Sequence, residues 1–356
     1  MPQSSNSESF LAASSVLEKA RLNATKAQHD LDGLLAESIG RYNSEDTSLV
    51  VFGSLAREEW TSGSDLDWTY LIDGQANSDH LRISQEIGAV LKKHGDRFRS
   101  PGQTGTFGNL AFSHELVHQI GGHTDSNKNT TQRVLLLLES AAIGASTQAY
   151  DRVLKAVINR YLEEDNHVLT EDRKSYRVPR FLLNDIVRFW RTMAVDFASK
   201  QRDRAGEGWG LRNTKLRMSR KLILASGLLV CFGCTLDSEL QSRISTDKSD
   251  IRLDLVNHIR DRVRLTPLQM LNKSLRAYEV PDTVQSDFFT SYADFIALLD
   301  DSACREKLQA LRASDSRTDP TFKRVKEISA VFEKSLDYIF FESPQLKPLT
   351  RKYGVF

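Results

Sequence analysis

The chain has 356 residues, 40% of them hydrophobic, and carries 48 Lys and Arg against 47 Asp and Glu. This length and composition predict two domains with a large buried core, and the near-zero net charge argues against binding to bulk nucleic acid. No run approaches the roughly 18 apolar residues of a membrane span, the polar start lacks signal-peptide features, and three cysteines suit a reducing compartment, so we expect a cytoplasmic protein with no membrane partner.

The first 45 residues are polar and then helical. Apolar side chains recur at roughly helical spacing at Val16, Ala20, Leu22, Ala27, Leu31, Leu34 and Leu35. We expect residues 1–45 to form a helical segment that packs on the core of the following domain.

Two short apolar runs come next, and each is typical of a buried strand. The first covers residues 49–52 and stops at Gly53, and the second covers residues 66–72 and is entered through Asp65 and Asp67. Because strand side chains alternate, both aspartates should project from one face with Cα atoms about 7 Å apart. Two carboxylates this close predict a bound cation, and Mg²⁺ prefers such ligands together with substrate phosphates.

Gly53 and Ser54 lie where the first strand turns into a predicted helix. Glycine lets the backbone approach a ligand closely, and N–H groups with a hydroxyl at such a turn can hold an anion. Arg57, one helical turn further on, could add a forked cation to the same phosphates. We therefore predict a phosphate-binding turn beside a carboxylate pair that binds metal.

Gly53-Ser54, a ten-residue spacer and Asp65-Leu66-Asp67 together resemble the signature of the DNA polymerase beta-like nucleotidyltransferase superfamily. The residues around the motif are similar to those of bacterial members. The resemblance implies that Asp65 and Asp67 are catalytic and hold Mg²⁺, while Gly53 and Ser54 bind the nucleotide.

Members of this superfamily that catalyse transfer usually add a third carboxylate from a later strand. Here the strand expected at residues 106–112 contains Asn109 and no acid. Glu115 follows in the first turn of a predicted helix capped by Ser113, where the helix dipole also favours an acid. Glu115 is therefore either a third catalytic ligand or a helix-start residue, and Asp125 is a further candidate.

Two other patterns have metal-binding or redox spacing. His114-Glu115-x-x-His118 has the form of a zinc-hydrolase helix, and a chance match at a helix start is the alternative. Cys231 and Cys234 form a single pair at the end of an apolar helix, which favours buried structural thiols over a metal or redox site.

Helical periodicity dominates the rest of the chain. Helices are predicted near residues 78–94, 150–162, 181–197, 214–233, 250–261, 284–299 and 321–341. We therefore predict an α+β fold in which a mixed-sheet nucleotidyltransferase core, residues 46–145, precedes an all-α domain, residues 146–356. This arrangement resembles bacterial nucleotidyltransferases with a carboxyl-terminal helical substrate-binding domain, related to the uridylyltransferases of nitrogen signalling and the adenylyltransferase of glutamine synthetase.

A basic run at residues 212–221 follows a Gly208-Trp-Gly turn. If a helix begins near Asn213, its N-terminus and the side chains of Lys215 and Arg217 could receive a triphosphate, and Trp209 could stack on the base. The alternative is that these basic residues solvate one face of a helix whose other face is core.

These patterns predict a Mg²⁺-dependent enzyme that moves a nucleoside monophosphate from an NTP, ATP or UTP above all, to an acceptor hydroxyl and releases pyrophosphate. The acceptor would be a protein or a small molecule. The absent third carboxylate leaves a second hypothesis, a catalytically silent nucleotide-binding regulator. A synthase of signalling oligonucleotides fits the same motif.

Overall fold

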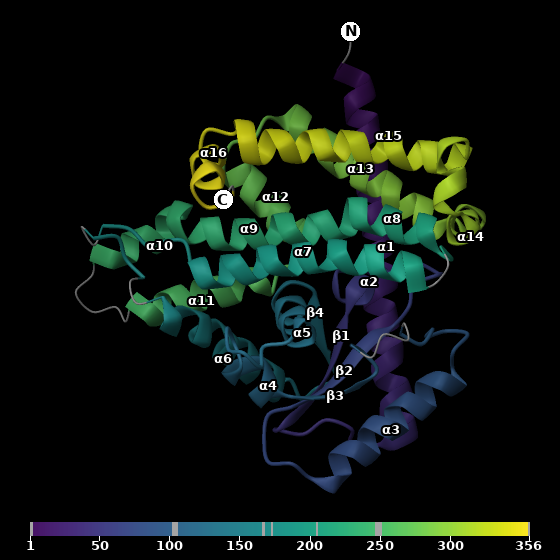
Figure 1. The fold of residues 1–356 in the computed structure, drawn as a ribbon, viewed down its shortest axis with the longest axis vertical. Coiled ribbons are helices and arrows are strands. Elements are labelled where there is room, and N and C mark those ends of the chain that lie inside the picture. The colour runs from purple at the N-terminus through teal and green to yellow at the C-terminus, as the bar shows by residue number, and fades with distance from the viewer. Residues whose placement is uncertain are drawn as a thin grey trace.

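The computed structural model of the protein describes residues 3–101, 106–165, 168–171, 174–203, 206–245 and 251–354. A small mixed sheet lies at one end of a larger helical assembly, which confirms the predicted fold class (Figure 1). The strands are ordered β3-β2-β1-β4. Strand β1 (Thr47–Phe52) is antiparallel to both β2 (Asp67–Ile72) and β4 (Ser140–Ile143), whereas β2 is parallel to β3 (Asn109–Phe112).

Helices surround the sheet and form the rest of the chain. Up to β4 they are α1 (Gln3–Ile39), α2 (Gly53–Ala56), α3 (Ser78–Lys93), α4 (Ser113–His118) and α5 (Asn127–Leu138). After β4 come α6 (Gln148–Glu164), α7 (Arg180–Asp203), α8 (Trp209–Lys215), the π-helical turn η1 (Leu216–Arg220), α9 (Lys221–Leu236), α10 (Ser238–Ser242), η2 (Arg243–Ser245), α11 (Ile251–Val263), α12 (Pro267–Ala277), α13 (Asp282–Asp300), α14 (Ser302–Ala310), η3 (Ala313–Arg317), α15 (Pro320–Asp337), η4 (Tyr338–Glu342), α16 (Leu346–Leu349) and η5 (Thr350–Gly354). The periodic pattern did not predict α5, α12 and α14. In α5, the apolar run at the end of the helix also fits a strand.

The two faces of the sheet belong to different hydrophobic clusters. In β1, Leu49 and Val51 pack in the cluster that contains α1 and α3 side chains, whereas Val50 and Phe52 join the larger cluster of the helical half. Leu71 of β2 joins the larger cluster as well. Because side chains alternate along a strand, Asp67 shares the face of Leu71 and is directed toward the helical half.

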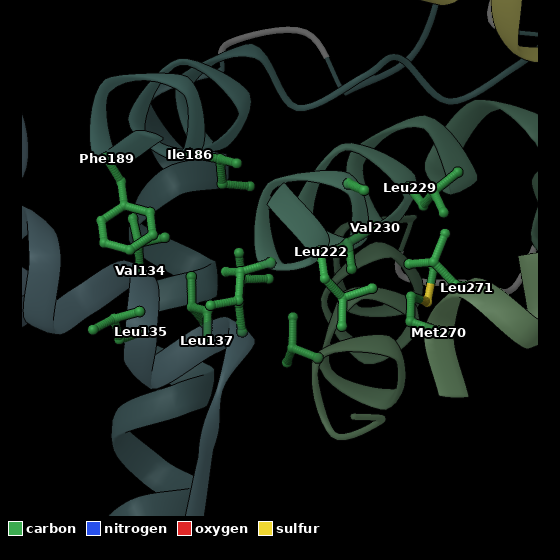
Figure 2. Close-up of a cluster of buried hydrophobic side chains, with 14 of the residues drawn as sticks. Val134, Leu135, Leu137, Ile186, Phe189, Leu222, Leu229, Val230, Met270 and Leu271 are labelled. Atoms are coloured by element: carbon green, nitrogen blue, oxygen red, sulfur yellow. The ribbon is translucent and has the colours of Figure 1, made fainter. Parts of the chain in front are cut away.

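Four helices interlock in the core of the helical half. Figure 2 shows buried side chains that meet there: Val134, Leu135 and Leu137 of α5, Ile186 and Phe189 of α7, Leu222, Leu229 and Val230 of α9, and Met270 and Leu271 of α12. Since α5 leads directly into β4, this core fixes the helical half to one edge of the sheet.

The long helix α1 runs past both halves (Figure 1). Ala20 is buried in the larger cluster, whereas Ala24, Ala27, Leu31 and Leu35 are buried in the cluster on the other face of the sheet. The helix packs along α13 and also contacts α2 and α3. Residues of α1 therefore take part in both hydrophobic cores.

The continuous helical stretch Trp209–Ser242 is long and apolar enough to cross a membrane, judged by length and composition alone. This stretch departs from the expectation that no segment is apolar enough for a membrane span. In the fold 61% of its most apolar part is buried, as befits the central helix of the helical half. Its burial explains why both of its cysteines, Cys231 and Cys234, are free and inaccessible.

Substitution of Gly227 tests how tightly this core is packed. A Cβ atom there would lie 2.8 Å from Leu138 Cδ1 and 2.9 Å from Ile186 Cγ2. We expect Gly227→Val to lower the free energy of unfolding by about 1–3 kcal/mol through overpacking. Gly33→Val is the matched control, because nothing lies within 4 Å of its Cβ position, and it should change stability by less than about 0.5 kcal/mol. Equal effects in chemical denaturation would contradict the packing described for α9.

Candidate active site

The two aspartates lie at the start of β2. Asp67 is its first residue and pairs with Phe52, the last residue of β1. Asp65 forms an isolated bridge with Arg99, and the Leu66 N–H donates to the Arg99 carbonyl at 2.9 Å. These backbone contacts hold the segment extended through both aspartates.

The Gly53-Ser54 turn faces Asp67 directly. Gly53 follows Phe52 with a φ of +69°, a conformation that glycine adopts without strain. A Cβ atom on Gly53 would lie 3.3 Å from Asp67 Oδ2, so the missing side chain lets the backbone approach the carboxylate. The short helix α2 begins at this point, as the sequence predicts.

A single pocket contains residues of both halves of the molecule. The sheet domain contributes Gly53, Ser54, Arg57, Glu59, Thr61, Ser64, Asp65 and Asp67, and the helical half contributes Lys215, Ser219, Arg220, Phe295, Ile296, Leu299 and Arg305. Carboxylates therefore come from the sheet side, whereas three of the four cations come from the helical side. A metal bound to nucleotide phosphates needs this combination of charges.

The π-helical turn η1 explains how several basic-run side chains reach the pocket together. Lys215 and Ser219, four residues apart, share a face of any ordinary helix, but Arg220, one position further on, would normally turn away. A π-helical turn holds more residues than an α-helical one, so Arg220 also faces the pocket. Such turns are frequent at functional sites.

Burial and charge shift the pKa values of facing groups in the pocket. Burial raises the pKa of Asp67 to about 6, with the Arg220 guanidinium opposing the shift and the Asp65 and Glu139 carboxylates adding to it. Burial lowers the pKa of Lys215, which the carboxylates of Asp65 and Asp67 oppose. Each group thus favours a counter-charge in the pocket.

Beneath the pocket a chain of buried charges links the two halves. Arg57 Nε donates to Glu59 Oε2 at 2.8 Å, and Arg57 Nη1 donates to Glu139 Oε2. Glu139 Oε1 accepts from Arg220 Nη1 at 3.2 Å, and Glu59 Oε1 accepts from the hydroxyl of Tyr292 at 2.8 Å. Burial alone would lower the pKa of Arg57, but the two glutamates hold it well above its usual value.

Arg57 lines the pocket, and this network holds its side chain in place. The side chain is only 7% exposed, and its guanidinium already donates to Glu59 and Glu139. A phosphate would have to replace these buried ion pairs to bind the guanidinium, which is costly. Contact between Arg57 and a nucleotide therefore stays a prediction, whereas its ion pairs support the wall of the pocket.

Three further predicted residues lie away from the pocket. Glu115 follows Phe112, which pairs in parallel with Ile72, so Glu115 lies near the end of β2 opposite to Asp67. Trp209 packs against Phe322 with tilted rings whose centroids lie 5.0 Å apart, and Arg217 Nε donates to Asn213 Oδ1 at 2.7 Å. None of the three lines the pocket that contains the aspartates.

The helix start predicted near Asn213 is also wrong. Helix α8 begins at Trp209 after Gly208, whose φ of +64° makes it a left-handed cap. Lys215 lies well inside the helix, so side-chain cations rather than helix N–H groups face the carboxylates. The sequence did not predict that the pocket contains Ser219, Arg220 and Arg305. Arg220 belongs to the basic run at residues 212–221, whereas no sequence motif surrounds Arg305.

Glu115 and Asp125, the two acids named as a third carboxylate, do not line the pocket that contains Asp65 and Asp67. Asn109 is exposed on β3, and the parallel register brings Phe107 beside Asp67, where its ring packs on Phe52 at 4.9 Å. Asp125 is buried against Arg133 at 2.9 Å and Arg188 at 3.1 Å. Among the acids lining the pocket, Glu59 is committed to Arg57 and Tyr292.

Neither zinc nor redox spacing produces a site in the described residues. The rings of His114 and His118 lie 4.8 Å apart on the exposed side of α4. Yet no group of three or more His, Cys, Asp or Glu side chains in the described ranges could hold a metal ion. We therefore interpret His114 and His118 as a histidine pair near the start of a helix.

The pocket residues do fit Mg²⁺. Asp65 and Asp67 line the pocket side by side with carboxylate oxygens, the ligand atoms that Mg²⁺ prefers. Magnesium is commonly held by one or two carboxylates completed by water and substrate phosphates rather than by an all-protein cage.

Comparison with known proteins identifies one segment of the chain. Residues 34–96 match the family model described as a nucleotidyltransferase domain. The match includes the end of α1, the Gly53-Ser54 turn and both aspartates, and it stops before β3. A search of curated proteins finds no match to the chain.

The raised pKa of Asp67 predicts a pH-dependent stability in metal-free protein. Between pH 3.8, the ordinary pKa, and about 6, the folded chain keeps a proton that the unfolded chain has released. Stability from this group therefore falls as pH rises through that window. We expect Asp67→Asn to flatten the dependence and to raise the free energy of unfolding at pH 7 by about 1–3 kcal/mol in EDTA. Asp65→Asn, at a more exposed carboxylate, should do less. Denaturation curves that stay parallel for wild type and Asp67→Asn from pH 4 to pH 7 would refute the burial argument.

Proposed function

We propose that this chain, which carries a nucleotidyltransferase domain of the DNA polymerase beta-like superfamily at residues 34–96, transfers a nucleoside monophosphate from an NTP to an acceptor hydroxyl with release of pyrophosphate. The observation that carries the proposal is the shared pocket. Asp65, Asp67, Gly53 and Ser54 line it together with Lys215 and Arg220 of the helical half.

Each group has a chemical task in this proposal. The Gly53-Ser54 turn and the Lys215 and Arg220 cations hold the triphosphate and its charge. Asp65 and Asp67 hold Mg²⁺, which when bound would orient the phosphates and neutralise charge on the leaving pyrophosphate. Phe295, Ile296 and Leu299 of α13 close the pocket with apolar surface, which restricts water around the charged groups.

We define the acceptor by its chemical class. It must carry a hydroxyl, and the near-zero net charge disfavours a long nucleic acid. A protein or small-molecule hydroxyl remains our proposal, as does ATP or UTP as donor, in the cytoplasm. A second nucleotide as acceptor, giving a signalling oligonucleotide, would use the same carboxylates.

One observation favours a second function, a nucleotide-binding regulator without transfer activity. Phe107 packs on Phe52, the strand partner of Asp67, and the nearby Glu139 is already paired with Arg57 and Arg220, so no free third carboxylate among the described residues lines the pocket beside the aspartates. Such a protein would bind Mg-NTP in the same pocket and release nothing.

Pyrophosphate release decides between the two functions. The full chain would be incubated with Mg²⁺, each NTP in turn and a small-molecule extract or cell lysate, with mass spectrometry of the products. We expect pyrophosphate and a modified acceptor, both lost in Asp65→Asn and Asp67→Asn. Nucleotide binding without pyrophosphate under all conditions would favour the regulator, and absence of binding would reject both.

Lys215 tests whether the helical half binds the triphosphate. Lys215→Ala removes a charge that faces the carboxylates from across the pocket, so Mg-NTP affinity should fall by about 1.5–3 kcal/mol, with KM affected more than kcat. Lys221→Ala is the matched control, because Lys221 pairs with Glu333 and does not line the pocket. Calorimetric titration checks both variants. Unchanged affinity in Lys215→Ala would separate the helical half from nucleotide binding.

A further inference from the structure

Arg305 of α14 reaches the pocket from a part of the chain that carries no recognisable motif. Its Nη2 lies 3.8 Å from Asp65 Oδ1, and its Nη1 lies 3.5 Å from both Thr61 Oγ1 and the Leu299 carbonyl. The Arg305 side chain is only 11% exposed, whereas that of Asp65 is 47% exposed. A buried guanidinium therefore lies beside one of the two proposed metal ligands.

The loop before β2 is shaped around this side chain. A Cβ atom on Gly63 would lie 2.4 Å from Arg305 Nε, 2.5 Å from its Cδ and 2.8 Å from its Cζ. The guanidinium and its stem thus lie flat against the Gly63 backbone, and any larger residue at position 63 would displace them. This close approach defines the place of Arg305 in the pocket.

The polar contacts of Arg305 are longer than those of the other pocket arginines. Its three partners lie at 3.5–3.8 Å, whereas Arg57 lies 2.8 Å from Glu59 and Arg220 lies 3.2 Å from Glu139. Long contacts are weak, so Arg305 can exchange partners at lower cost than Arg57 or Arg220. Phosphate oxygens are strong acceptors for such a forked donor.

We propose that Arg305 is an exchangeable counter-ion: it balances Asp65 while the pocket lacks nucleotide and transfers to the nucleotide phosphates when Mg-NTP enters. Only the transfer of Arg305 to nucleotide phosphates rests on the proposed function. A divalent cation on Asp65 repels the adjacent guanidinium, while the phosphates that accompany the cation attract it. Arg305 therefore opposes binding of free metal and favours binding of the metal–nucleotide complex.

Opposite changes in two affinities test the proposal on the full chain. Free Mn²⁺ binding is measured by electron paramagnetic resonance without nucleotide, and binding of a non-hydrolysable Mg-NTP analogue by calorimetry. In Arg305→Gln we expect Mn²⁺ to bind several-fold more tightly and the analogue to bind about 10- to 150-fold more weakly. Lys307→Gln removes one exposed charge from the same helix and should change neither affinity.

Gly63→Ala provides an independent variant that keeps the arginine. The new Cβ should push Arg305 off its position and so tighten Mn²⁺ binding without any change in total charge. Looser or unchanged Mn²⁺ binding in both variants, or parallel losses of both affinities, would overturn the proposal. If the wild type binds Mn²⁺ but not the analogue, the proposed function fails instead, whereas unchanged analogue affinity in Arg305→Gln overturns only the role of Arg305.

Discussion

The pocket between the sheet and the helical half of this protein depends on one chain of alternating charges beneath it. From Tyr292 it passes through Glu59, Arg57 and Glu139 to Arg220, and so links α13, the loop after α2, the α5–β4 junction and the π-helical turn. Each buried charge in it has an opposite partner, without which it would cost several kcal/mol. Removal of Arg57 would leave Glu59 with no cation among the members of this chain, so the chain depends most on that arginine.

The same chain of charges shapes the pocket above it. Glu139 fixes Arg220 at the pocket wall, and the Glu139 carboxylate in turn adds to the raised pKa of Asp67. Arg57 is consumed by the two glutamates, so the cations left to face the carboxylates are Lys215, Arg220 and Arg305, all from the helical half. The contacts that join the sheet to the helical half therefore also decide which charges a nucleotide would meet.

A feature could be predicted from the sequence when the residues that produce it lie close together along the chain. Gly53 and Ser54 follow β1 directly, and Asp65 and Asp67 lie just before and at the start of the adjacent strand β2. Alternation along an extended segment was enough to place the two aspartates on one face. The ion pairs of Arg57 could not be foreseen, because one of its acids, Glu139, is 82 residues away. The place of Glu115 could not be foreseen either, because a parallel β2–β3 register, which periodicity does not reveal, carries it to the far end of β2 from Asp67. Arg305 had no sequence signal at all, since only the packing of α14 brings it to Asp65.

The π-helical turn at Leu216–Arg220 has a consequence for the ancestry of this helix. Such a turn is equivalent to one residue inserted into a regular α-helix. Deleting one residue there would restore the regular helix and rotate one flank against the other by about 100°. After such a deletion, the helix could keep the buried face of α9 in the core, or it could direct Lys215 and Arg220 at the aspartates. It could not do the two things together. In any related chain, the presence or absence of that single residue would show whether the helix still serves the pocket or only the core.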